Sequence, residues 1–267
     1  MINVYDCRNG LLVKLDEGAS VGPETVWIDL VNPTPDDEAT IEHVLGLDVP
    51  TRDEAREIEA SSRFYEEDGG TFMTTSIIYF PDNPTPTTGS VTFVLKETRL
   101  VTVRYVEPRA FPVFASRAEK GAVSCNSGGT VMIGLIETIV DRIADVIERI
   151  QDDVEKLTHN VFNLNTQRRD SSRRLDVLLR STGKEGDLVA RVLESATSLD
   201  RTMRRASSAE IIVPPSTCSA SVLQWLTGTP EMVAGETTGT GRRTVGRACL
   251  PFTVHRSPFT VHRSPFT

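Results

Sequence analysis

The amino-acid sequence is poor in the features that mark membrane-spanning, secreted and zinc-scaffold proteins. No apolar run approaches the roughly 20 residues that a membrane-spanning helix needs. The best candidate, residues 131–140, is interrupted by Glu137 and followed directly by Asp141. The N-terminus lacks the basic start and apolar centre of a signal peptide. The four cysteines form no Cys-x-x-Cys pair, so they predict reduced thiols rather than a disulfide framework or a zinc site. We therefore expect a soluble chain that stays in the cytoplasm.

Catalytic signatures and a basic surface are missing as well. The sequence contains no P-loop, HExxH, GxSxG or Rossmann fingerprint, and no nucleophile beside a general base stands out, so we do not expect an enzyme. The 267 residues include 29 Lys and Arg against 37 Asp and Glu, a net charge of −8, which argues against nucleic-acid binding. Residues 1–160 hold 28 acidic and 14 basic residues, whereas residues 161–267 hold 9 and 15. An acidic body joined to a basic helical region favours cation handling or packing between protomers.

Strand and helix signals alternate through residues 1–125 and predict a layered α/β (α+β) head. Thr34 is placed to cap a helix that starts at Pro35 and ends at Gly46. A second, short helix is expected from Thr51 to about Ala60. Runs of β-branched and aromatic residues bounded by turn residues indicate strands at 3–5, 11–15, 26–30, 63–67, 71–80, 91–95 and 100–105, with a proline-containing loop over 81–90.

Beyond residue 125 the hydrophobic pattern becomes that of long helices. Ile136, Ile143, Ile150 and Leu157 recur every seven residues, which predicts one helix over 130–163, about 50 Å long. A second helical stretch begins near Ser171 and is expected to be interrupted at 182–186, where two glycines occur. Together they predict long antiparallel helices of coiled-coil character over 126–206.

The last part, residues 207–267, changes character again. Ser, Thr, Gly and Pro dominate it, and the sequence PFTVHRS is repeated from Pro251 and Pro258. A seven-residue repeat that contains proline cannot continue a coiled coil, and its copies are too few for a solenoid. We expect this tail to be disordered.

The densest carboxylate group lies at the start of the second short helix. Asp53 and Glu57 share a helix face, so with Glu54 they can coordinate a hard cation such as Mg²⁺ through water. The alternative is a capping box, in which the Glu54 carboxylate accepts a hydrogen bond from the Thr51 backbone. Spacing alone favours the capping box. The acidic residues of 141–155 lie on the outside of the long helix, as a solvated face or as a stripe that concentrates divalent cations.

Five segments closely resemble the cytoplasmic domain of CorA magnesium/cobalt transporters, in particular their proteobacterial branch. They are 27–38 (WIDLVNPTPDDE), 51–68 (TRDEAREIEASSRFYEED), 90–95 (SVTFVL), 99–104 (RLVTVR) and 137–148 (ETIVDRIADVIE). The resemblance covers about residues 1–200 and fades between 200 and 206. It implies an α/β head with a mixed sheet, followed by the long helices of a funnel-shaped homopentamer. The stalk helix, the two membrane spans and the Tyr-Gly-Met-Asn signature of the family are missing from this chain.

The resemblance also implies a function and a site. In the family, Mg²⁺ bound between cytoplasmic domains holds the pore closed. One of its carboxylates corresponds to a position near Glu54, with Asp53 beside it, and its partner lies on the stalk. We therefore expect the sensing and gating part of a Mg²⁺/Co²⁺ transporter of the inner membrane, with divalent cations and further copies of the chain as partners. Mg²⁺ binding at Asp53 and Glu54 is expected to be weak.

Two alternatives remain at the level of sequence. One is a soluble acidic interaction or metal-buffer domain without transport activity, which fits a chain that lacks the membrane segments. The other is a zinc-transporting branch of the same superfamily, because the resemblance places cation choice in the missing segment.

Overall fold

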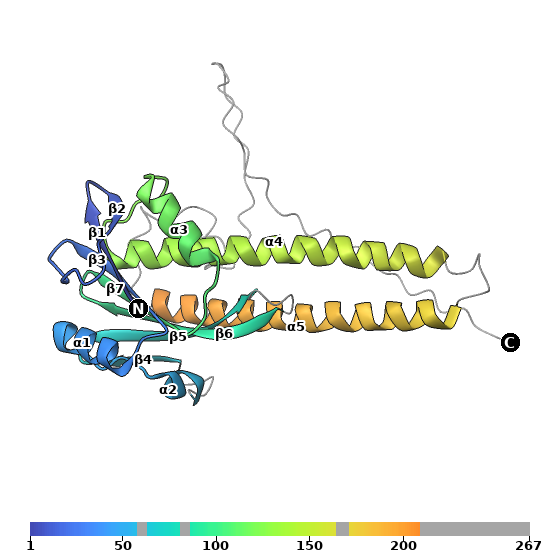
Figure 1. Cartoon of the computed structure of the whole chain (residues 1–267), viewed down its shortest axis with the longest axis horizontal. Coiled ribbons are helices and arrows are strands. Elements are labelled where there is room, and N and C mark those ends of the chain that lie inside the picture. The colour runs from blue at the N-terminus through green and yellow to red at the C-terminus, as the bar shows by residue number, and fades with distance from the viewer. Residues whose placement is uncertain (58–62, 81–85, 164–170, 209–267) are drawn as a thin grey trace, which may run out of the picture. The chain divides into compact units, whose positions relative to one another are not determined.

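The computed structural model describes residues 1–57, 63–80, 86–163 and 171–208 (Figure 1). The part of the predicted disordered tail from residue 209 onward lies outside these described residues. Residues 207 and 208, assigned to the tail by the sequence, instead end a helix. Among the described helices, none combines the length and the apolar composition that crossing a lipid bilayer requires.

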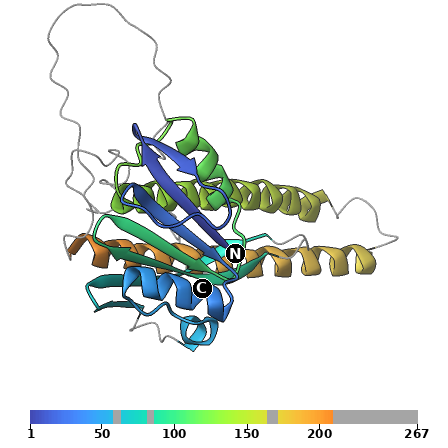
Figure 2. The same ribbon diagram turned by 60° about the vertical axis from the view of Figure 1, so that its left-hand side comes forward.

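A seven-stranded sheet forms the centre of the described chain (Figure 2). Its order is β2-β1-β3-β7-β6-β5-β4. The pair β3–β7 is parallel and every other neighbouring pair is antiparallel, so the expected mixed sheet is confirmed. The strands are β1 (Ile2–Arg8), β2 (Leu11–Lys14), β3 (Thr25–Val31), β4 (Phe64–Glu67), β5 (Gly70–Tyr79), β6 (Thr87–Lys96) and β7 (Arg99–Arg104).

Helices cover both faces of the sheet, and each face buries its own apolar cluster. On one face, Ile28 and Leu30 of β3 pack with Ile41 of α1 (Pro35–Leu45). On the other face, Trp27 and Phe114 belong to a larger cluster shared by α3 (Ala110–Glu119), α4 (Gly128–Asn163) and α5 (Ser171–Ser208). Because it is covered on both sides, β3 is buried along its whole length.

A buried ion pair joins the two parallel strands. Asp29 on β3 accepts hydrogen bonds from Nε and Nη2 of Arg104 on β7, both at 2.9 Å, and from Thr102 Oγ1 at 2.8 Å. The Trp27 indole N–H donates to the same Thr102 hydroxyl at 3.0 Å. The Asp29 and Arg104 side chains are only 3% and 9% exposed. Their bidentate geometry offsets the desolvation of two charges, so the head has a charged but fully bonded centre.

The structure confirms the predicted helix over 130–163 and starts it two residues earlier, at Gly128. The Gly128 N–H donates to the Thr98 carbonyl at 2.6 Å, and a Cβ at this position would collide with the backbone of Arg99 and Leu100. Glycine therefore allows the start of α4 to approach β7 closely. The heptad residues Ile136, Ile143 and Ile150 are buried, as their spacing predicts.

Three features differ from the sequence prediction. The helix α5 runs without interruption through 182–186, because Gly183 and Gly186 lower helix stability by only about 1 kcal/mol each within a long helix. The strand β6 begins at Thr87, inside the predicted loop over 81–90, because the last proline is Pro86 and residues 87–90 pair with β5. The helix α3 was not predicted; its Pro112 lies in the first turn, where a missing N–H is tolerated.

Two serines of α5 bond to the free edge of β5. The strand β4 pairs only with the first part of β5, so the rest of that edge has no strand beside it among the described residues. Ser198 Oγ accepts a hydrogen bond from the Ser76 N–H at 2.9 Å, and Ser195 Oγ accepts one from the Ile78 N–H at 3.1 Å. Both serines are buried. The helix therefore covers a strand edge that would otherwise be left with unpaired donors.

We expect Ser198→Ala to lower the free energy of unfolding by about 1 to 3 kcal/mol, because the buried Ser76 N–H loses its acceptor. Denaturant unfolding measures this loss, and hydrogen exchange at the Ser76 amide should speed up with it. The control is Thr182→Ala, at an exposed position of the same helix, which should change stability by no more than about 0.5 kcal/mol. Equal losses in the two variants would contradict this role for Ser198.

Candidate functional site

The predicted carboxylates Asp53 and Glu54 lie in the first turn of α2 (Arg52–Glu57). Residues 58–60 of the predicted helix lie outside the described part of the chain. A shallow groove of about 420 Å³ separates the start of α2 from the start of α1. Its lining consists of Asn32, Pro33, Pro35, Glu38, Thr51, Arg52, Asp53 and Tyr105. The fold thus brings two helix starts and the end of β7 into one place.

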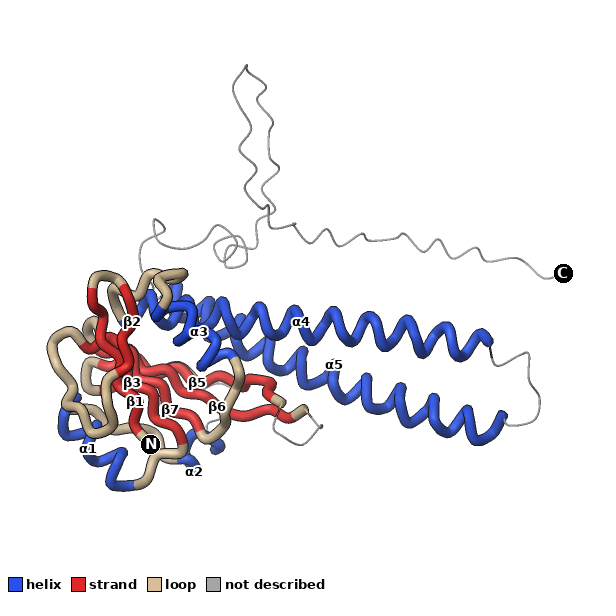
Figure 3. Tube along the Cα trace, turned by 45° about the horizontal axis from the view of Figure 1, so that its top comes forward, coloured by secondary structure: helices blue, strands red, loops and turns tan. Residues whose placement is uncertain are grey.

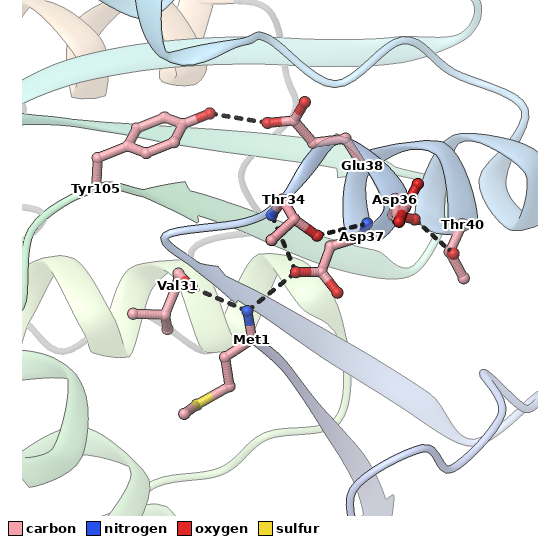
Figure 4. Close-up of polar contacts among 8 residues, drawn as sticks. All are labelled: Met1, Val31, Thr34, Asp36, Asp37, Glu38, Thr40 and Tyr105. Carbon is pink, nitrogen blue, oxygen red and sulfur yellow. Dashed lines mark hydrogen bonds and ion pairs between the residues drawn. The ribbon is translucent and has the colours of Figure 1, made fainter.

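The first turn of α1 is held by its own carboxylate (Figure 4). Asp37 Oδ2 accepts a hydrogen bond from the Thr34 backbone N–H at 3.0 Å, and Thr34 Oγ1 accepts one from the Asp37 N–H at 3.3 Å, which completes a capping box. The Met1 ammonium donates to the same Asp37 oxygen at 3.1 Å. The Thr34 backbone N–H, and then the other donors, lower the pKa of Asp37 below its usual value. Asp37 is therefore engaged in structure.

Glu38 is engaged too, through a contact that the sequence did not suggest. The Tyr105 hydroxyl donates to Glu38 Oε1 at 3.0 Å (Figure 4), and the Arg52 guanidinium lies over the Tyr105 ring, 5.6 Å from its centroid. Burial, followed by the hydrogen bond to Glu38, raises the pKa of Tyr105 well above its ordinary value, so the phenol remains a donor at neutral pH. No spacing pattern links these three residues, which come from three separate elements.

The start of α2 forms a second capping box, the alternative that spacing favoured. Glu54 Oε2 accepts hydrogen bonds from the Thr51 N–H at 2.9 Å and from the Thr51 hydroxyl at 2.8 Å, and the Glu54 N–H donates back to that hydroxyl at 3.4 Å. The bond from the Thr51 backbone is the main cause that lowers the pKa of Glu54. The second oxygen of Glu54, Oε1, makes no hydrogen bond with the described residues.

Asp53 is the carboxylate of this groove that stays unengaged. It makes no hydrogen bond or ion pair with any described residue, and together with Glu54 Oε1 it presents carboxylate oxygens at an exposed helix start. Mg²⁺ commonly binds through one or two carboxylates and keeps several waters. The side chain of Glu57 lies outside the described residues, and within those residues no group of three or more His, Cys, Asp or Glu is arranged to hold a metal ion.

The acidic residues along α4 show the salt-bridged, exposed surface of a long helix. Asp145 lies 3.3 Å from Arg142, and Asp153 lies 2.8 Å from Lys156, each pair three residues apart. Such exposed pairs contribute little to stability. Of the two interpretations of the acidic residues in 141–155, the solvated helix face therefore applies to Asp145 and Asp153.

We expect the pKa of Glu54 to lie below that of an ordinary glutamate, because the Thr51 donors favour the ionised form. Since the folded pKa is lowered, the capping contribution to stability is present above the ordinary pKa and is lost as the pH falls through the folded one. Thr51→Val keeps the backbone N–H but removes the hydroxyl donor, so the Glu54 pKa should rise part of the way. A carboxyl-detected NMR titration measures the pKa of Glu54 in the wild type and in Thr51→Val. Equal pKa values in the two proteins would show that the Thr51 hydroxyl does not lower the pKa of Glu54.

Comparisons with known proteins agree with this architecture. The chain is 32% identical over 147 residues to the magnesium transport protein CorA of Escherichia coli, and 30% identical over 148 residues to that of Sodalis glossinidius. Each match covers 54% of this chain and 46% of the relative, so the chain spans about half the length of these curated relatives. The crystal structure of the ZntB cytoplasmic domain from Vibrio parahaemolyticus is similar at a TM-score of 0.57 and 14% identity, covering 78% of this chain and 79% of that one. That likeness concerns the fold alone.

A family model described as CorA-like Mg²⁺ transporter protein matches residues 23–209. This range begins just before β3, includes the groove residue Asp53 and its neighbour Glu54, and ends one residue after α5. It thus spans the head from β3 onward and the two long helices. The chain belongs to the CorA-like Mg²⁺ transporter family.

Proposed function

We propose that this chain is the cytoplasmic sensing and gating part of a divalent metal-ion transporter that moves Mg²⁺ and Co²⁺ across the inner membrane. The observation that carries the proposal is the family match over 23–209, which includes both long helices and five of the seven strands of the sheet. The described residues would supply the regulatory part of such a protein. The conducting part would come from membrane segments beyond them.

The sensing role falls to Asp53 and Glu54. Both lie in the first turn of α2, and carboxylate oxygens are the ligands that Mg²⁺ prefers. Arg52 does not neutralise them: it makes no ion pair with the described residues, and its guanidinium lies over the Tyr105 ring instead. The stacking thus leaves Asp53 available to an external cation.

A neighbouring protomer supplies the remaining Mg²⁺ ligands, and this sharing of the ion accounts for gating. One protomer supplies too few oxygens for a complete shell, so the ion is held weakly, with millimolar affinity, by an isolated chain. A neighbouring protomer that completes the shell tightens the binding and is in turn held in place by the ion. Loss of the ion then shifts the population away from the closed arrangement of protomers. No covalent chemistry takes part.

A Mg²⁺ titration followed by thermal unfolding at constant ionic strength tests the sensing site. A ligand that binds only the folded state adds about 1.4 kcal/mol at ten times its Kd, roughly 3 to 5 °C for a domain of this size. We expect Asp53→Asn and Glu54→Gln each to reduce this response. Glu54→Gln keeps an acceptor for the Thr51 N–H, so it isolates the charge from the cap.

The matched control is Asp16→Asn, which removes one negative charge from the exposed loop between β2 and β3. It should respond to Mg²⁺ as the wild type does. If neither Asp53→Asn nor Glu54→Gln changes the response, Glu54 is only a capping residue and the sensing proposal fails. Stabilisation by Zn²⁺ and not by Mg²⁺ would instead support the zinc-transporting alternative.

A further inference from the structure

A cavity of about 740 Å³ lies between the sheet and α4. The helices α4 and α5 pack against each other as an antiparallel helical hairpin, and α4 also contacts α3 and β7 (Figure 3). The cavity is bounded by the end of β5, by the segment that joins β7 to α3, and by the middle of α4. Cavities of this size in proteins commonly hold small molecules.

The cavity lies at the ends of the two parallel strands. The strand β3 ends at Val31 and β7 ends at Arg104, and the residues that follow them, Asn32 and Tyr105, both line the cavity. In sheets with parallel strands, ligands commonly bind outside the carboxyl ends of those strands. The Asn32 side-chain amide makes no hydrogen bond with the described residues, so it is available to a ligand.

Three arginines from two helices line this cavity. Arg109 lies at the start of α3, and Arg142 and Arg149 lie on α4. The two on α4 are seven residues apart, which is nearly two full turns, so they lie on the same side of the helix, about 10 Å apart along its axis. Ile139 and Val146 fall on that side as well; both line the cavity and are buried. The helix α4 therefore offers the cavity a face that is both apolar and basic.

The described residues neutralise these arginines only in part. Arg142 Nη1 donates to Asp145 Oδ2 at 3.3 Å, but Arg109 and Arg149 make no ion pair with the described residues. The other carboxylate of the lining, Glu107, is exposed and makes no ion pair with those residues either. Three arginines and two carboxylates give the lining a net charge of +1, in a chain whose net charge is −8. The cavity is thus locally basic in an acidic protein.

An aromatic contact holds Arg149 in place at the cavity. Its guanidinium lies over the Phe80 ring, 5.6 Å from the ring centroid, and Phe80 itself is partly buried against the apolar cluster of the head. A guanidinium stacked on a ring keeps the N–H groups of its edge available as donors, and Arg149 makes no hydrogen bond with the described residues. The contact therefore orders this side chain without neutralising its charge.

We propose that this cavity binds a small molecule that carries two or more linked phosphate groups. The planar fork of arginine matches phosphate oxygens with two parallel hydrogen bonds. Two arginines spaced along α4, with a third at the start of α3, favour an extended anion with several charges over a single phosphate. Inorganic polyphosphate and nucleoside polyphosphates share this chemistry. The binding goes beyond sensing and gating, and uses neither Asp53 nor Glu54.

Isothermal titration calorimetry of the full chain tests the site, with EDTA present to exclude cations that would bridge a phosphate to a carboxylate. The probes are sodium triphosphate, ATP and citrate, compared at equal ionic strength. We expect triphosphate and ATP to bind, and citrate, a carboxylate anion, to bind at least about tenfold more weakly. Tighter binding of ATP than of triphosphate would identify a nucleoside polyphosphate as the ligand, and equal binding would identify the phosphate chain alone.

Arginine variants locate the binding in the cavity. Arg149→Gln should weaken the binding of triphosphate about tenfold, and Arg149→Lys, which keeps the charge but not the fork, should recover only part of this loss. The matched control is Arg180→Gln on α5, at an exposed position that does not line the cavity. It should leave the affinity within about twofold of the wild type. Thermal unfolding confirms that each variant is folded.

Three results would overturn the proposal: a wild type that binds neither triphosphate nor ATP, equal weakening by Arg149→Gln and Arg180→Gln, or citrate bound as tightly as triphosphate. Asp53 and Glu54 do not line the cavity, and their response to Mg²⁺ is measured without any phosphate present. This proposal and the sensing proposal can therefore fail separately.

Discussion

Two backbone N–H groups on the free edge of β5 determine where the helical hairpin can lie. A buried strand edge must find acceptors for its donors, and here Ser195 and Ser198 of α5 supply them through their hydroxyl oxygens. This requirement fixes the face of α5 that meets the sheet. It thereby also fixes which face of α5 is turned away from the sheet.

The candidate site and the hairpin are joined through the same part of the sheet. The helix α2 contacts β6, β6 pairs with β5 in a continuous register from Gly70–Lys96 to Tyr79–Thr87, and β5 is bonded to α5. A displacement of α2 by an ion would therefore act on the strand pair that holds α5. At the site itself, Asp37, Glu38 and Glu54 are bonded within the protein, which leaves Asp53 with both oxygens unengaged.

The sequence predicted the features that depend on residues close together in the chain. The strands, the heptads of α4 and the Thr51–Glu54 capping box all follow from spacing within one segment, and the structure confirms them. The missed features depend on tertiary contacts. Tyr105 meets Glu38 only after the sheet has formed, and Ser195 and Ser198 look like ordinary helix positions until an unpaired edge lies beside them. The predicted interruption of α5 is wrong because packing on α4 and β5 outweighs the low helix propensity of its two glycines.

We propose that divalent cations bind the head at the start of α2 rather than along the acidic face of α4. Mn²⁺ prefers oxygen ligands as Mg²⁺ does, and its unpaired electrons broaden the NMR signals of nearby nuclei. A titration with substoichiometric Mn²⁺, followed on the backbone amides and reversed by excess Mg²⁺, tests this claim most directly. The account predicts that the amides of residues 52–55 broaden first. Broadening that begins at residues 141–155 and leaves α2 sharp would contradict it.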